Sequence, residues 1–148
     1  MDDDAIRRYL SDHRAAAMIT LRPDGTPHAV RCGLGLVDGR IWSSGRPDRV
    51  RTAHLRRDPR ATLFVFGAAS DDPFSYLTLE TEVTILDGPD APELNRQLFT
   101  AMQAHMDPPA GTLFWEGAPH DEADFLRIMA EERRLIYEFR VTRSYGMV

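Results

Sequence analysis

The chain has 148 residues, of which 43% are hydrophobic and 28% charged, and its formal net charge is −5. These values predict one soluble globular domain over residues 1–148. No apolar run reaches the roughly 20 residues of a membrane-spanning helix, and residues 1–4 are acidic rather than signal-like, so we expect a cytoplasmic protein with no membrane contact. The single cysteine, Cys32, excludes an internal disulfide and a cysteine-based zinc site.

Charge is distributed unevenly along the chain. Residues 67–138 hold fifteen Asp and Glu against four Arg, whereas residues 46–60 hold six Arg against two Asp. Phosphate-backbone binders need a broad basic face, so we expect no nucleic-acid partner. A compact basic segment in an acidic chain favours one small anionic ligand instead.

The first 45 residues predict a helix followed by an antiparallel meander. The helix covers residues 2–13, and a strand follows at residues 15–21. Residues 22–26 contain Asp-Gly, a strong hairpin signal, and lead into a return strand at residues 27–37. A further turn leads to a third strand at residues 40–44.

Residues 44–60 combine the features of an anion site. The strand ends at the hydroxyl of Ser44, and an arginine-rich helix is predicted from near residue 47 to before residue 59. Arginines in a first turn oppose the helix dipole unless an anion lies there, so Arg49 and Arg51 are predicted to bind a phosphate-bearing cofactor. Arg56, Arg57 and Arg60 follow at the other end, where cations complement the dipole, and are predicted to be structural.

The remainder alternates strands and helices. The pattern predicts strands at 60–66, 75–86 and 134–141, helices at 91–106 and 121–133, and loops at 67–73 and 107–119. Segregated helices around about six strands indicate an α+β fold, an antiparallel, Greek-key-like split β-barrel with short peripheral helices.

Several single residues have a structural interpretation beside a functional one. His54 is predicted to be a hydrogen-bonded core residue, and Cys32 a small buried hydrophobe. Gly33 and Gly35 alternate in a strand, which indicates close approach of a ligand or a partner backbone. Trp115 is either a lid over the site or an anchor for its loop.

Three passages resemble a known family. They are AMITLRPDGTPH at residues 17–28, RVRTAHLRRDPR at residues 49–60, and residues 133–146, which run from RRLI to RSYG. Their order is similar to that of the pyridoxamine-phosphate-oxidase-like split β-barrels, and within these to the small oxidoreductases that use the deazaflavin coenzyme F420. The sequence departs from that pattern at His54, where Asn is usual, at Arg51, where Lys is common, and at Arg31, where a smaller polar residue is frequent.

The resemblance implies a homodimer with a cofactor in the groove between two barrels. It implies that Arg49, Arg51 and Thr52 hold the cofactor's phosphate, with Ser44 nearby. It also implies that residues 28–31, including His28 and Arg31, flank the ring.

The implied activity is hydride transfer between F420 and a small conjugated or quinone-like substrate. FMN is the alternative cofactor, because both place a phosphate at the same position. Arg31 and Arg46 exceed what one phosphate needs and favour F420, whose tail carries carboxylates. A non-catalytic flavin- or haem-binding protein is a further alternative. A pyridoxamine-phosphate oxidase proper is disfavoured, because its paired substrate motifs are missing near the C-terminus.

Overall fold

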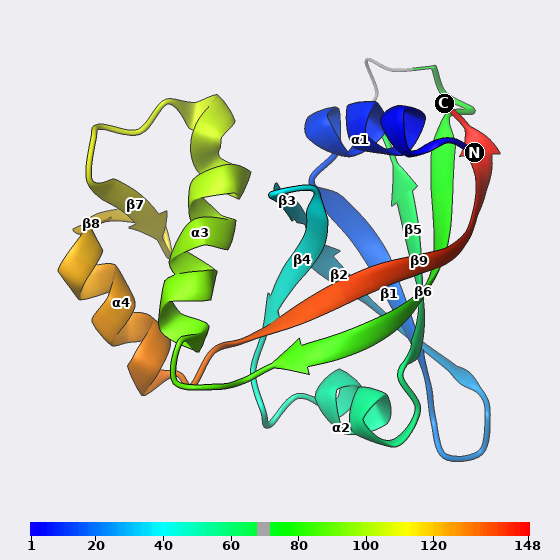
Figure 1. Cartoon of the computed structure of the whole chain (residues 1–148), viewed down its shortest axis with the longest axis horizontal. Coiled ribbons are helices and arrows are strands. Elements are labelled where there is room, and N and C mark those ends of the chain that lie inside the picture. The colour runs from blue at the N-terminus through cyan, green and yellow to red at the C-terminus, as the bar shows by residue number, and fades with distance from the viewer. Residues whose placement is uncertain (68–71) are drawn as a thin grey trace.

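The computed structural model describes residues 1–67 and 72–148, and within them an α+β fold. A seven-stranded antiparallel sheet, in the order β2-β1-β5-β6-β9-β4-β3, curls into a half-barrel (Figure 1). Its strands are β1 (Ala15–Leu21), β2 (Pro27–Gly33), β3 (Gly35–Val37), β4 (Arg40–Gly45), β5 (Arg60–Phe66), β6 (Tyr76–Leu86) and β9 (Leu135–Met147). The other elements are α1 (Asp3–Asp12), α2 (Val50–Arg57), α3 (Ala91–Gln103), the 3-10 turn η1 (Ala104–Met106), β7 (Thr112–Trp115), β8 (Ala118–Asp121) and α4 (Glu122–Glu131).

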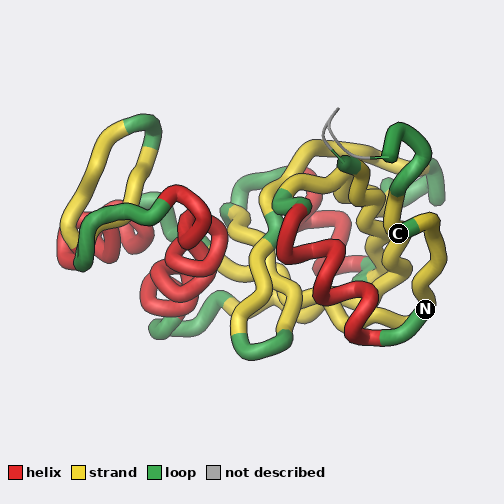
Figure 2. Tube along the Cα trace, turned by 90° about the horizontal axis from the view of Figure 1, so that it is seen from above, coloured by secondary structure: helices red, strands yellow, loops and turns green. Residues whose placement is uncertain are grey.

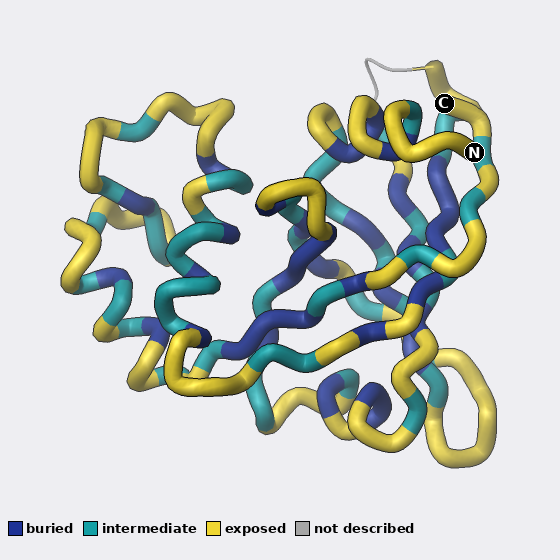
Figure 3. The backbone as a smooth tube through the Cα atoms, in the orientation of Figure 1, coloured by how far each residue is buried: buried dark blue, intermediate teal, exposed yellow. Residues whose placement is uncertain are grey.

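Alternation along the strands builds the core. In β1, Ala16, Met18 and Thr20 are buried, and their neighbours along the strand are only half-buried. The same period-2 pattern in β5 buries Leu63 and Val65. Met18, Leu63 and Val65 belong to one apolar core cluster, and Figure 3 shows how buried residues recur along the strands.

Two helices lie at opposite ends of the half-barrel (Figure 1). α1 is capped by Asp2, whose side chain accepts a 2.8 Å hydrogen bond from the Ala5 amide, and it buries Ile6 and Leu10 against the barrel core. α2 lies at the other end and buries Leu55 in the same core. These helices close the two ends between which the sheet curls.

The segment from α3 to α4 forms a separate layer beside the barrel (Figure 2). Leu113, Phe125 and Met129 form its own apolar cluster. α3 joins this layer to the barrel, since a Cβ added at Gly33 would lie 2.5 Å from Met102 Cε and one at Gly35 would lie 2.6 Å from Leu98 Cδ1. The close approach predicted at the two glycines is therefore made by α3 of the same chain.

The predicted meander is wrong at residues 27–37. The strand breaks at Leu34, whose amide donates to the carbonyl of Arg14, and the chain then leaves β1. β2 pairs with β1 and β3 pairs with β4, so the two halves of the predicted strand lie at opposite edges of the sheet.

Other boundaries differ for local reasons. The predicted loop 107–119 contains most of a hairpin, β7–β8, whose turn residues Glu116 and Gly117 have φ of 50° and 79°, the left-handed pair of a type I′ turn. α2 begins at Val50, later than predicted, and β9 continues to Met147 because it pairs with β6 along that length. The predicted loop 67–73 includes residues 68–71, which lie outside the described residues.

Candidate functional site

β2 and the connection from β4 to α2 flank one edge of the half-barrel, which we call the seam (residues 27–33 and 44–52). Among the residues that the structure describes, β2 is the outermost strand of the sheet and pairs only with β1. The Ser43 hydroxyl, in β4, donates a 2.7 Å hydrogen bond to the carbonyl of Gly33 and fixes the top of the seam. Below that bond, the second edge of β2 has no paired strand within residues 1–67 and 72–148, so its backbone groups lack sheet partners there.

Tyr137 of β9 organises the β4–α2 connection. Its ring packs so closely on Gly45 that an added Cβ would lie 2.3 Å from Tyr137 Cζ. Its hydroxyl shares a 2.5 Å hydrogen bond with the Thr52 hydroxyl, which also donates to the carbonyl of Arg46 at 2.7 Å. A strand end, a helix start and a distant strand are thus tied together by side-chain hydrogen bonds.

Three buried polar atoms at the seam have no hydrogen-bond partner. They are His28 Nδ1, Arg46 Nε and Arg51 Nε, and among the described residues they are the only buried side-chain N or O atoms in that condition. Arg51 contacts the carbonyl of Ser44 through Nη2 at 3.5 Å and lies over the Tyr137 ring at 5.5 Å. A buried donor without an acceptor costs free energy, so these atoms indicate a site completed by a ligand.

Arg49 is the N-cap residue of α2 and is exposed. Its side chain makes no capping hydrogen bond. Because the first amides of a helix have no intrahelical acceptors, this end of α2 presents backbone donors beside a guanidinium. Arg49 therefore lies where the sequence predicted it, at the entrance of the helix.

Ser44 and Thr52 are placed at the seam, but their hydroxyls are engaged. The Ser44 hydroxyl donates a 2.6 Å hydrogen bond to Asn95 Oδ1 of α3. Thr52 is fully buried and holds Tyr137 and Arg46. In this structure both residues support the connection, and a direct bond from either hydroxyl to a ligand requires one of these bonds to break.

His28 and Arg31 project to opposite faces of β2. His28 lies against His54 with ring centroids 5.1 Å apart, whereas Arg31 is exposed on the outer face. Successive side chains on a strand point to opposite faces, so two residues that are three positions apart lie on different faces. The resemblance implied that both residues flank the cofactor's ring, but the strand separates their two side chains.

His54 is a core residue, as predicted. It is buried, and its Nδ1 shares a 2.9 Å hydrogen bond with the buried Thr20 hydroxyl. Burial lowers the pKa of His54, and the nearby His28, Arg57 and Arg22 lower it further. His54 thus supports α2 as a neutral imidazole.

Cys32 is buried in the barrel core, as predicted. Burial raises the pKa of its thiol, while a hydrogen bond with Ser43 and the charges of Arg51 and Arg31 act in the opposite direction. A buried, protonated thiol is a packing group. Because the charge of Arg51 lowers the pKa of Cys32, Arg51 lies close enough to β2 to act on it across the seam.

The arginines at the C-terminal end of α2 are structural, as predicted. Arg56 pairs with Asp87 at 2.9 Å, Arg60 pairs with Asp58 at 2.8 Å, and Arg57 donates to the carbonyl of Leu21. The Arg60 hydrogen bond holds the pKa of Asp58 at about 2. Each of these guanidinium groups already has a protein acceptor.

Sequence reasoning missed two residues of the site. One feature of the sequence could have indicated Tyr137: Gly45 ends a strand, and a glycine there is typical of a position where another side chain packs directly on the backbone. Asn95 left none, since its contact with Ser44 depends on how α3 docks.

Among the described residues no group of three or more His, Cys, Asp or Glu is arranged to hold a metal ion. In the same residues, the helices are all too short or too polar to span a bilayer.

The curled antiparallel sheet defines a split β-barrel of the pyridoxamine-phosphate-oxidase-like class. Residues 2–137 match the family described as Pyridoxamine 5'-phosphate oxidase, and the chain belongs to this family. The predicted fold class is confirmed.

Solved structures share this fold at low sequence identity. The conserved hypothetical protein Rv2991 from Mycobacterium tuberculosis has a TM-score of 0.75 at 20% identity, over 99% of this chain and 84% of that one. An F420 Reductase has a TM-score of 0.63 at 20% identity, over 94% of both chains. A heme binding protein from Mycobacterium smegmatis has a TM-score of 0.67 at 17% identity, over 98% of this chain and 53% of that one.

Proposed function

We propose that this protein is an oxidoreductase that holds a flavin-type cofactor at the seam, with F420 preferred and FMN as the alternative. The observation that carries the proposal is the pair of buried, unpartnered Nε donors of Arg46 and Arg51 beside the start of α2. A phosphate there supplies acceptors for both and neutralises a cluster of like charges. The family supports a flavin-type ligand, and the fold it shares with an F420 Reductase is compatible with the deazaflavin.

The residues present fit such a cofactor. Arg46, Arg49 and Arg51 hold its phosphate, while Thr52 and Tyr137 hold the arginine-bearing connection in place. The open edge of β2, with His28 beside it, lies along the ring. The cofactor supplies the hydride chemistry when bound, and the protein binds it, orients it and excludes water. The substrate class we propose is a small conjugated or quinone-like acceptor.

We also propose a homodimer, whose second copy covers the convex face of the sheet. Aromatic side chains gather there on the adjacent strands β5, β6 and β9. The ring centroid of Phe64 lies 5.6 Å from those of both Phe66 and Tyr76, and Tyr145 follows on β9. Phe66 is 59% exposed and Tyr145 is 45% exposed. A contiguous apolar patch of this kind favours a protein partner. Light scattering at micromolar concentration checks the proposal, and a monomer would contradict it.

The decisive experiment is spectroscopic. The purified protein is examined by absorbance and then titrated separately with FMN and with F420. The proposal predicts saturable binding of at least one, and oxidation of the reduced cofactor by a quinone acceptor when protein is present. A Soret band with no affinity for either cofactor would replace the proposal with haem binding. Tight binding without turnover would reduce it to a carrier.

A further inference from the structure

One buried polar atom of the seam remains without a partner when a phosphate is bound. His28 Nδ1 is buried and accepts or donates no hydrogen bond among the described residues, where the only other such side-chain atoms are Arg46 Nε and Arg51 Nε. Those two are guanidinium donors, which a phosphate satisfies. His28 Nδ1 needs a different partner, because a buried polar atom without one costs free energy.

The neighbouring His54 shows how the same fold satisfies an imidazole. Its Nδ1 shares a 2.9 Å hydrogen bond with the Thr20 hydroxyl of β1, and Thr20 is opposite His28 in the β1–β2 register. The rings of His28 and His54 meet edge to face, with centroids 5.1 Å apart and planes at 86°. Neither neighbour forms a hydrogen bond with His28 Nδ1, so this nitrogen is available to a ligand.

His28 and the phosphate-binding arginines lie at different ends of the seam. Arg51 acts on Cys32, where its charge opposes the rise that burial gives the pKa of the thiol. Cys32 and His28 are on the same face of β2 and four residues apart, which separates their backbones by roughly 13 Å along the strand. A ligand that meets both ends is therefore elongated, with an anion at one end and a hydrogen-bonding group at the other.

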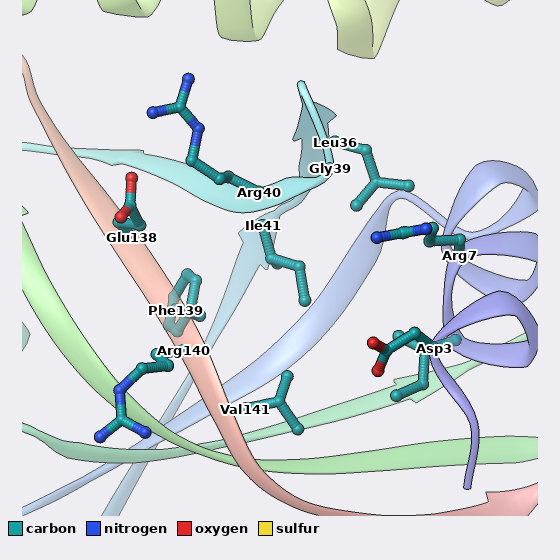
Figure 4. A pocket seen from close by; sticks show the side chains of 11 residues that line it. Asp3, Arg7, Leu36, Gly39, Arg40, Ile41, Glu138, Phe139, Arg140 and Val141 are labelled. Carbon is teal, nitrogen blue, oxygen red and sulfur yellow. The ribbon is translucent and has the colours of Figure 1, made fainter.

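A second cleft shows that charged side chains alone do not make such a site. A cavity of about 270 Å³ lies between α1 and strands β3, β4 and β9 (Figure 4), and none of its lining residues has a buried, unpartnered polar side-chain atom. Its arginines have acidic neighbours, since Arg7 lies 3.8 Å from Asp4 and Arg40 lies 3.7 Å from Asp38. What distinguishes the seam is the burial of polar atoms that lack partners.

We propose that His28 determines which ring the seam accepts, because its Nδ1 accepts a hydrogen bond from the imide N–H of the cofactor's ring. The inference rests on the proposed function, since FMN and F420 share a ring edge on which an N–H lies between two carbonyl groups. A neutral imidazole has one acceptor nitrogen, and an imide N–H is a donor that fits it. A site with a buried hydrogen-bonding group discriminates strongly against a ligand that leaves this group unpaired. His28 thus selects the ring, while the arginines select the phosphate.

The test compares FMN and F420, each beside the same cofactor methylated at its imide nitrogen, in fluorescence titrations of the full chain. Methylation removes the N–H and leaves the phosphate unchanged. For a cofactor that binds the wild type, we expect the methylated form to bind about tenfold more weakly, a loss of roughly 1.4 kcal/mol. His28→Leu should lower the affinity for the unmodified cofactor about tenfold and bind the two forms equally. His28→Asn, whose side-chain oxygen replaces Nδ1 as acceptor, should keep the preference for the unmodified form.

Arg51→Ala is the matched control at the other end of the seam, because it should weaken binding of both forms and keep their ratio. His105→Leu, at an exposed position, should change neither affinity. Thermal melts of each variant establish that it is folded. Equal affinity of the wild type for the two forms, or a ratio that persists in His28→Leu, would overturn this inference and leave the proposed function standing. Absence of saturable binding of both cofactors would overturn the two together, as would a Soret band that His28→Leu removes, which would make His28 a haem ligand.

Discussion

The two ends of α2 carry similar residues in opposite circumstances. At the C-terminal end, Arg56 has a carboxylate partner, as does Arg60 at the start of β5, and cations near this end complement the helix dipole. At the N-terminal end, Arg46 and Arg51 have buried Nε atoms without partners, although Arg46 Nη2 lies 3.2 Å from Asp48, and cations there oppose the dipole. Arginine content alone therefore does not mark a site. What marks it is a pair of buried guanidinium donors that the described residues leave without acceptors.

Removing arginines from each end tests this contrast most strongly. Arg51→Ala should weaken cofactor binding by about ten- to a hundredfold, since a hydrogen bond between charged groups contributes roughly 1.5–3 kcal/mol. Arg49→Ala should fall at the lower end of that range, because Arg49 is exposed. Arg56→Ala is the control from the same helix. Equal effects of all three on equilibrium binding of FMN would mean that the arginines act through net charge or stability.

Gly45→Ala should disrupt the connection that positions the N-terminal arginines. The added methyl would meet the Tyr137 ring, which must move and lose its bond to Thr52. Overpacking of this kind costs about 1–3 kcal/mol in the free energy of unfolding. Chemical denaturation of wild type and variant measures the cost. Gly88→Ala is the control, since its new Cβ would meet only the flexible side chain of Asp90 at 3.2 Å, and a comparable loss there would show that the Tyr137 contact is not special.

The preference for F420 over FMN should be modest, within a few fold. Arg49 at the helix entrance already holds the phosphate of either cofactor, so the carboxylates of the longer cofactor add only exposed contacts around it, and exposed contacts of this type are weak and are screened by salt. Equilibrium binding of both cofactors at low and moderate salt measures the preference. Tighter binding of FMN at low salt would establish the FMN alternative.

The smallest predicted effect concerns His54, midway along α2. Its folded pKa lies below the ordinary value of 6.5, so below that pH the unfolded chain takes up a proton more readily than the folded protein does. The stability contributed by neutral His54 is therefore present above about pH 6.5 and is lost as the pH falls toward the folded pKa. His54→Gln should flatten that part of the stability–pH curve, measured by denaturation at several pH values. His105→Gln, at an exposed position, should not.

Local patterns of residues were sufficient to predict several elements. The apolar runs at residues 15–21 and 60–66, the alternation at residues 75–86 and the Asp-Gly turn predicted three strands and the first hairpin, all of which are present. The position of Arg49 and Arg51 at the start of a helix was also predictable, because helix limits depend on nearby prolines and on the strand that precedes them. The β7–β8 hairpin was not predicted, since its turn, Glu116-Gly117, lacks the usual Asn or Asp.

The sequence by itself determined the α+β class, the basic start of α2 and the structural role of the arginines near the C-terminal end of that helix. Propensity, alternation and charge are properties of residues that are close in the chain. Tertiary structure alone decided where β3 pairs, what fills the space beside Gly33 and Gly35, and that Tyr137 holds Thr52 across 85 residues of chain. It also decided that Arg31 lies on the opposite face of β2 from His28. Contacts between distant segments depend on how the sheet curls and how α3 docks, and no local pattern of residues encodes them.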